Sequence, residues 1–126
     1  MDCPCCSGKK YSDCCKPYHE GTPAPTVLAL MRSRYASYAL GNVQYIIRTT
    51  HPQSPYFEKD RKKWERAISE FCRTTTFVKL EILGYGEDWV HFAAYLKQAD
   101  VLILDERSSF EKVDGQWLYL KGDFKK

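Results

Sequence analysis

Apolar residues recur at three- and four-residue spacing in three stretches of the middle of the chain, and this spacing predicts three helices. The first is expected to begin after Thr26, a good N-cap, and to end at Gly41. The second starts near Asn42 and ends before His51-Pro52, and the third is capped by Asp60 and runs to about Cys72. Their apolar stripes are Val27, Leu30, Met31, Tyr35 and Tyr38; Val43, Tyr45, Ile46 and Ile47; and Trp64, Ala67, Ile68 and Phe71.

After Arg73 the pattern changes to short runs of β-branched and aromatic residues, which are typical of strands. Asp114-Gly115 is the strongest hairpin signal, because glycine accepts the positive φ of a tight turn. Helices followed by strands with short connections indicate an α+β domain with an antiparallel sheet. Four strands are expected, at Thr74–Leu83, Trp89–Leu96, Val101–Lys112 and Gln116–Lys121.

Residues 1–21, here called the N-terminal module, differ from the rest of the chain. They contain five of the six cysteines and show no apolar periodicity, so they do not form a hydrophobic core of their own. The two prolines in Thr22–Pro25 predict a short, stiff connection after this module. We therefore expect two parts, the N-terminal module at 1–21 and an α+β domain at 22–126.

Four cysteines of the N-terminal module have the spacing of a metal site. Cys3 and Cys5 form one close pair, and Cys14 and Cys15 form a second across one loop. Tetrahedral Zn²⁺ binds four such donors, and metal binding replaces the missing core. The sequence therefore predicts one structural zinc held by these four thiolates. A disulfide knot or plain loop cysteines are the alternatives in an oxidising compartment, and redox catalysis would require a C-x-x-C between a strand and a helix.

Three further residues compete for roles at this site. Cys6 is a fifth thiol in the same loop, and we expect it to stay unligated. Cys72 lies at the end of a predicted helix, where a cysteine is usually a small buried apolar residue. His19 is near enough in sequence to replace Cys15 as a ligand, although the four cysteines already complete the set.

Composition and charge narrow the classes of function. The chain is 44% hydrophobic and 28% charged, as in ordinary globular proteins. Its formal charge of +3 would fall close to neutrality with four thiolates on one Zn²⁺. So small a net charge argues against sequence-specific binding to DNA. Neither a leader-like start nor an apolar run long enough to span a membrane is present, so we expect a cytoplasmic protein that binds no membrane.

Residues 3–15 resemble the SEC-C motif, C-P-C-x-S-G-K-x-Y-x-x-C-C/H, found at the tail of the bacterial translocation ATPase SecA. Cys6 departs from the motif, which usually has glycine there. The remaining chain is similar to the YchJ family of bacterial proteins, which has no established biochemical role. The matching segments, in order, are Ala29–Tyr35, Thr50–Pro52, Glu106–Phe110 and Gly115–Tyr119.

The resemblance implies a small zinc knuckle followed by an NTF2-like (cystatin-like) cone, in which three helices pack on a curved four-stranded antiparallel sheet and enclose a cavity. Candidate pocket residues are His91, Tyr95, Glu106, Trp117 and Tyr119. His91 or Glu106 would be the general base of an enzyme, but neither has a catalytic partner at a meaningful spacing. Aromatic core residues and an ion pair are the simpler interpretation, so no catalytic residue is predicted.

Two hypotheses of function follow. The SecA tail contacts the SecB chaperone and ribosomes, so by analogy the knuckle would dock on a protein or on ribosomal RNA. The candidate contact residues are Lys9, Lys10, Tyr11 and Lys16. The alternative is a small-molecule binder or enzyme that uses the cavity. Arg32 and Arg34, on either side of Ser33 in the first predicted helix, either bind an anion or form salt bridges that cap the cone, and the salt bridges are the simpler interpretation. NTF2-like sheets often pair through their exposed face, so a homodimer is also expected.

Overall fold

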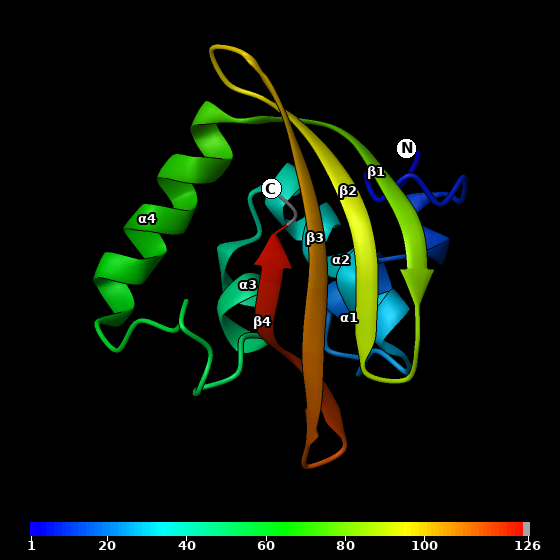
Figure 1. Cartoon of the computed structure of the whole chain (residues 1–126), viewed down its shortest axis with the longest axis vertical. Helices are drawn as coiled ribbons and strands as arrows, with labels where there is room; N and C mark the ends of the chain where they lie inside the picture. The colour runs from blue at the N-terminus through cyan, green and yellow to red at the C-terminus, as the bar shows by residue number, and fades with distance from the viewer. Residues whose placement is uncertain (125–126) are drawn as a thin grey trace.

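The computed structural model describes residues 1–124 and has the expected α+β fold (Figure 1). A single antiparallel sheet in the order β1-β2-β3-β4 follows the helices in the chain. The helices are η1 (Tyr11–Asp13), α1 (Lys16–His19), α2 (Val27–Leu40), α3 (Val43–Arg48) and α4 (Arg61–Thr74). The strands are β1 (Thr76–Tyr85), β2 (Trp89–Lys97), β3 (Val101–Val113) and β4 (Gln116–Phe124).

The predicted caps fix where the three longer helices begin. The Thr26 hydroxyl accepts a hydrogen bond from the backbone N–H of Ala29 at 3.1 Å and starts α2. Asn42 and Asp60 cap α3 and α4 in the same way. Gly41 has a φ of 73°, which ends α2 in the left-handed conformation that glycine adopts without strain.

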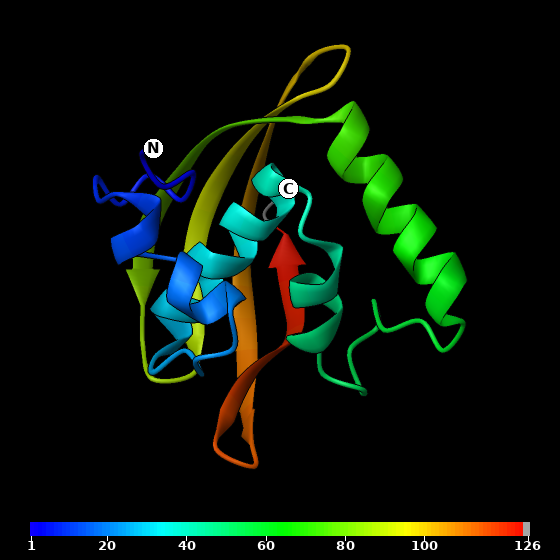
Figure 2. The same cartoon turned by 180° about the vertical axis from the view of Figure 1, so that it is seen from behind.

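The hydrophobic core lies between α2 and the concave face of the sheet. Figure 2 shows α2 and α3 over this face, while α4 stands to the side of β4. A smaller cluster, Ile46, Ile47, Trp64 and Ile68, joins α3 to α4. The main core contains Val27, Leu30, Met31, Tyr35, Tyr45, Leu80, Val90, Phe92, Leu96, Phe110 and Tyr119.

Four predicted boundaries are wrong by a few residues. Helix α4 continues to Thr74, whose hydroxyl donates to the carbonyl of Glu70 at 2.8 Å in the last turn, so β1 begins at Thr76 instead of Thr74. The same strand reaches Tyr85, and β4 reaches Phe124. At the ends of β1 and β4, strand pairing continues past the predicted run of β-forming residues. Among residues 1–124, no helix combines the length and apolar character needed to cross a bilayer.

Candidate metal centre

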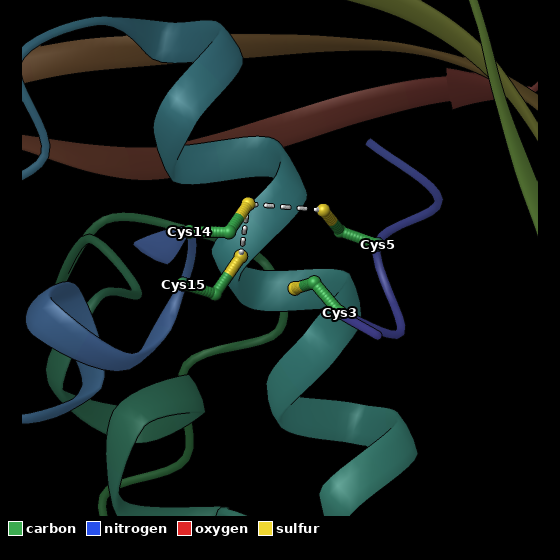
Figure 3. A group of neighbouring side chains, drawn as sticks. All are labelled: Cys3, Cys5, Cys14 and Cys15. Atoms are coloured by element: carbon green, nitrogen blue, oxygen red, sulfur yellow. Dashed lines mark hydrogen bonds between the residues drawn. The ribbon is translucent and has the colours of Figure 1, made fainter. Parts of the chain in front are cut away.

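The side chains of Cys3, Cys5, Cys14 and Cys15 converge on one point, as Figure 3 shows. Their four sulfur atoms all lie within 4.8 Å of one another. The Cys5–Cys14 sulfurs are 3.6 Å apart and the Cys14–Cys15 sulfurs 3.9 Å apart. Zn–S bonds of about 2.3 Å in a tetrahedron place sulfurs about 3.8 Å apart. The donor set and its spacing therefore fit a tetrahedral metal ion, and none of the four cysteines forms a disulfide.

Backbone turns bring the two cysteine pairs together. The N–H of Cys3 donates to the carbonyl of Lys9 at 2.9 Å, which closes the loop between the pairs. Within this loop Cys6 and Gly8 have φ values of 64° and 86°. A left-handed conformation favours glycine, which explains why the SEC-C motif usually has glycine where this chain has Cys6. The Cys6 side chain is exposed and lies outside the sulfur cluster.

The thiols of Cys3, Cys5 and Cys15 strongly influence one another's ionisation. A hydrogen bond from Cys15, assisted by Ser7, Cys3 and Cys14, lowers the pKa of Cys5 to about 4. The same pairing with Cys5 raises the pKa of Cys15, and burial raises the pKa of Cys3 to about 11. One thiolate is thus stabilised by its neighbours, whereas further thiolates are opposed. A divalent cation held by the four sulfurs would remove this opposition and favour the thiolate form of its ligands.

The N-terminal module is anchored on helix α2 rather than on a core of its own. Ala36 of α2 is completely buried against Cys3, Cys5 and Cys15. From the preceding turn of α2, the Nη1 atom of Arg32 donates to the carbonyl of Cys5 at 2.9 Å. The cysteine cluster and α2 therefore form one packed unit. The predicted division at residues 22–25 stays a prediction.

His19 joins the same contact and does not contribute to the sulfur cluster. Its Nε2 lies 2.8 Å from the carbonyl oxygen of Ser33, which only accepts, so Nε2 carries the hydrogen. Nδ1 then accepts from the Tyr11 hydroxyl at 2.7 Å. Burial lowers the pKa of His19, which favours this neutral form. Because both ring nitrogens are engaged, His19 is not available to replace Cys15.

The candidate contact residues fall into two groups. Lys9, Lys10 and Lys16 are exposed on the module, and their role as a contact surface stays a prediction. Tyr11 is half-buried, and its hydroxyl is used by His19. Tyr11 is therefore a residue that holds the module on α2 rather than a displayed contact residue.

Cys72 lies in the cluster with Trp64 and Ile68, where burial raises its pKa.

A cavity of about 600 Å³ lies between α4, α2 and the sheet. Two of the five candidate pocket residues, Glu106 and Tyr119, line it. The prediction for the other three is corrected, because none of them lines it. Trp117 shares the strand alternation of Tyr119 but packs on the core near the Asp114-Gly115 hairpin.

His91 and Tyr95 lie on the opposite face of the sheet from the cavity. Side chains alternate along a strand, and Phe92, Ala94 and Leu96 occupy the cavity face of β2. The Nε2 atom of His91 instead lies 2.7 Å from a carboxylate oxygen of Asp105 on the neighbouring strand β3. The hypothesis that His91 is a base inside the cavity is therefore wrong. The sequence alone left this open, because the facing of a strand depends on its register.

Sequence reasoning missed Ser108, which is completely buried beside Glu106. The Ser108 hydroxyl donates to Oε2 of Glu106, and the Tyr119 hydroxyl donates to the same oxygen at 3.3 Å. Burial raises the pKa of Glu106, while these two hydrogen bonds and the charge of Arg34 lower it. A serine within a strand does not by itself indicate a hydrogen bond to a buried carboxylate. The one sequence signal is that Ser108 follows Glu106 by two residues, so both side chains lie on the same face of the strand.

Comparison with known proteins agrees with the fold and with the cysteine cluster. Residues 26–122 match the family model described as YchJ, middle NTF2-like domain. A UPF0225 protein of Deinococcus radiodurans is 40% identical over 121 residues, covering 94% of this chain and 85% of the relative.

Two solved structures are similar along most of the chain. The solution structure of a SEC-C motif containing protein from Rhodopseudomonas palustris has 32% identity and a TM-score of 0.79, covering 100% of both chains. The crystal structure of a SEC-C motif containing protein from Psychrobacter arcticus has 28% identity and a TM-score of 0.75, covering 94% of this chain and 79% of the other. The chain therefore belongs to the YchJ family.

Proposed function

We propose that Cys3, Cys5, Cys14 and Cys15 hold one structural Zn²⁺ and that the metal-bound N-terminal module docks the protein on a partner. The observation that supports the metal is the convergence of four sulfur atoms within 4.8 Å. Four protein ligands leave no position for water or substrate, which is the arrangement of a structural zinc site. Three of the cysteines are buried and Cys14 is half-buried, which suits a closed site.

Co²⁺ substitution tests the coordination directly. We expect the Co²⁺-loaded protein to show the intense visible absorption of tetrahedral thiolate coordination. The Cys14→Ser, Cys15→Ser variant should lose it, whereas Cys6→Ser should keep it, because Cys6 lies outside the cluster. A weak octahedral spectrum, or a spectrum unchanged in the double variant, would contradict the site.

The docking proposal depends on the fixed placement of the module on α2. Because Arg32 and His19 hydrogen-bond across this contact, the exposed lysines project from a rigid surface. The module exposes as many acidic as basic side chains, namely Asp2, Asp13 and Glu20 beside Lys9, Lys10 and Lys16. Protein surfaces that bind nucleic acid carry an excess of positive charge. A protein partner with acidic groups facing the lysines therefore fits better than RNA.

Chemical crosslinking followed by affinity capture tests the docking surface. We expect the variant with Lys9, Lys10 and Lys16 changed to glutamate to lose the partner captured by the native chain. A matched variant with Lys97, Lys112 and Lys121 changed to glutamate, all exposed on the sheet, should keep it. Capture that is equal in both variants, or that disappears with ribonuclease, would contradict a protein partner at this surface.

We also place the protein in a reducing bacterial cytoplasm. All six cysteines are free thiols in the structure, and the relatives described above are bacterial. A reducing compartment keeps such thiols available as metal ligands. Oxidation of the isolated zinc-free protein should therefore produce disulfides within the N-terminal module.

A further inference from the structure

The cavity contains two buried charged side chains that do not pair with each other. Arg34 is 6% exposed and Glu106 is 7% exposed, and both line the cavity. Within residues 1–124 no ion pair joins them, although the charge of Arg34 acts on Glu106. Buried charges are costly unless their hydrogen-bonding capacity is used.

Arg34 is positioned by one end of its guanidinium group. Its Nη1 atom donates to the hydroxyls of Thr49 and Thr50 at 2.8 and 3.2 Å and to the carbonyl of Ile46 at 3.2 Å. The guanidinium carbon lies 4.7 Å from the centre of the Tyr119 ring. Among the described residues, Nη2 and Nε have no hydrogen-bond acceptor. Arg34 is thus held in place with donors left over.

Glu106 is positioned by one of its two oxygens. Oε2 accepts from the hydroxyls of Ser108 and Tyr119, whereas Oε1 has no hydrogen-bond donor within residues 1–124. Gly122 packs directly on this carboxyl group, and a side chain at position 122 would overlap it. Glu106 is therefore also fixed, with one acceptor left over.

Most of the remaining wall is apolar and largely aromatic, with Glu58 and Lys63 as further charged side chains that are not buried. Tyr38, Phe71 and Phe77 pack together at ring-centre distances of 5.8–6.0 Å and form one part of the wall. The volume of about 600 Å³ lies within the usual range for small-molecule sites. An apolar wall with a few fixed polar groups is the usual composition of such a site.

We propose that this cavity binds a small molecule with an aromatic or apolar body and a neutral polar head that both accepts and donates hydrogen bonds, as a primary carboxamide does. The head accepts from Arg34 and donates to Oε1 of Glu106. The two side chains together carry no net charge, so an anionic head is opposed by Glu106 and a cationic head by Arg34. This site is separate from the cysteine cluster and independent of the zinc proposal.

Three probes of the same shape test the proposal: 2-naphthamide, 2-naphthoate and 2-methylnaphthalene, titrated into the full zinc-loaded chain and followed by NMR. We expect 2-naphthamide to bind at least about tenfold more tightly than the other two, because a buried polar site discriminates strongly against a head that leaves it unpaired. Shifts should concentrate on cavity residues such as Phe92 and Leu96. Equal affinity for the three probes, or no binding of 2-naphthamide, would overturn the proposal.

Glu106→Gln should reverse the order of affinity for 2-naphthamide and 2-naphthoate. A simple loss of stability would not reverse this order. The amide oxygen of the new side chain would accept from Ser108 and Tyr119, leaving its NH₂ group where Oε1 was. The site would then offer only donors and a net positive charge, so 2-naphthoate should bind more tightly than 2-naphthamide. An unchanged preference for 2-naphthamide would contradict the assigned role of Glu106.

Two further variants serve as controls. Ala67→Trp places a large side chain into the cavity from an exposed position on α4, and it should abolish binding without disturbing the core. His91→Gln lies on the opposite face of the sheet and should leave all three affinities unchanged. Binding that survives Ala67→Trp, or that is lost in His91→Gln, would place the probe elsewhere.

Discussion

Glu106 is deeply buried, and the hydroxyl groups of Ser108 and Tyr119 donate hydrogen bonds to its carboxylate. Burial raises its pKa and the hydrogen bonds lower it, and the net shift determines how Glu106 makes stability depend on pH. Because burial raises its pKa above the ordinary value, the folded chain binds a proton more readily than the unfolded chain. Its contribution to the free energy of unfolding is therefore largest at low pH. It declines as the pH rises from the ordinary range of glutamate through the raised pKa.

The prediction for Glu106 is a pH-dependent difference between two proteins. Glu106→Gln removes the titrating group but keeps the shape, so its stability relative to the native chain should increase as the pH rises from the ordinary pKa range of glutamate through the raised pKa of Glu106. Urea unfolding of both zinc-loaded proteins across this range measures the difference. Glu87→Gln, an exposed glutamate, should show no such trend. A difference that is flat or decreasing would contradict the raised pKa.

At the scale of elements, α2 is shared by the core and the metal centre. One face carries Leu30 and Met31 into the core, and Ala36 receives the cysteine cluster. The complete burial of Ala36 leaves no room for a larger side chain. The small residue at this position is therefore a requirement of the cysteine cluster rather than of the helix.

Ala36→Leu should weaken metal binding while the cone remains folded. The larger side chain would displace the module from α2 and misplace Cys3, Cys5 and Cys15, with an expected loss of about tenfold in zinc affinity. Competition with a chromogenic chelator measures this loss. Ala39→Leu, a half-exposed position on the same helix, should bind zinc as the native chain does. Equal zinc affinity in both variants would show that α2 does not support the site.

Sequence patterns predicted the elements better than the faces of the strands. The caps Thr26, Asn42 and Asp60 and the four strands were all recognisable, because local hydrogen bonding and residue type determine them. Which residues face the cavity depends on register, and β1 contains irregularities near Phe77–Lys79 and Ile82–Gly84. The inward role of His19 likewise depends on the packing of distant segments.

At the scale of the whole molecule, the metal should stabilise the N-terminal module far more than the cone. Residues 1–15 pack mainly on their own cysteines and on Ala36. Tyr18 and His19, by contrast, contact the main core and Tyr45 of α3. The cone has an independent core between α2 and the sheet. The homodimer expected from the family resemblance stays a prediction.

Removal of zinc by a chelator should therefore have a local effect. We expect amide hydrogen exchange to rise across residues 1–15, including the amides of Cys3 and Cys14 that close the loop and η1. Protection in β2 and β3 should persist because both lie inside the sheet. Mass spectrometry of exchanged peptides measures both regions. Uniform loss of protection along the chain would instead indicate a single cooperative unit held together by the metal.

The central claim is that one zinc ion is held by Cys3, Cys5, Cys14 and Cys15. The most direct measurement is the metal content, by inductively coupled plasma mass spectrometry, of protein purified without added metal. We predict one zinc per native chain and per Cys72→Ser chain, and none in the Cys14→Ser, Cys15→Ser variant. No zinc in the native chain, or equal zinc in the native and double-variant proteins, would contradict the account.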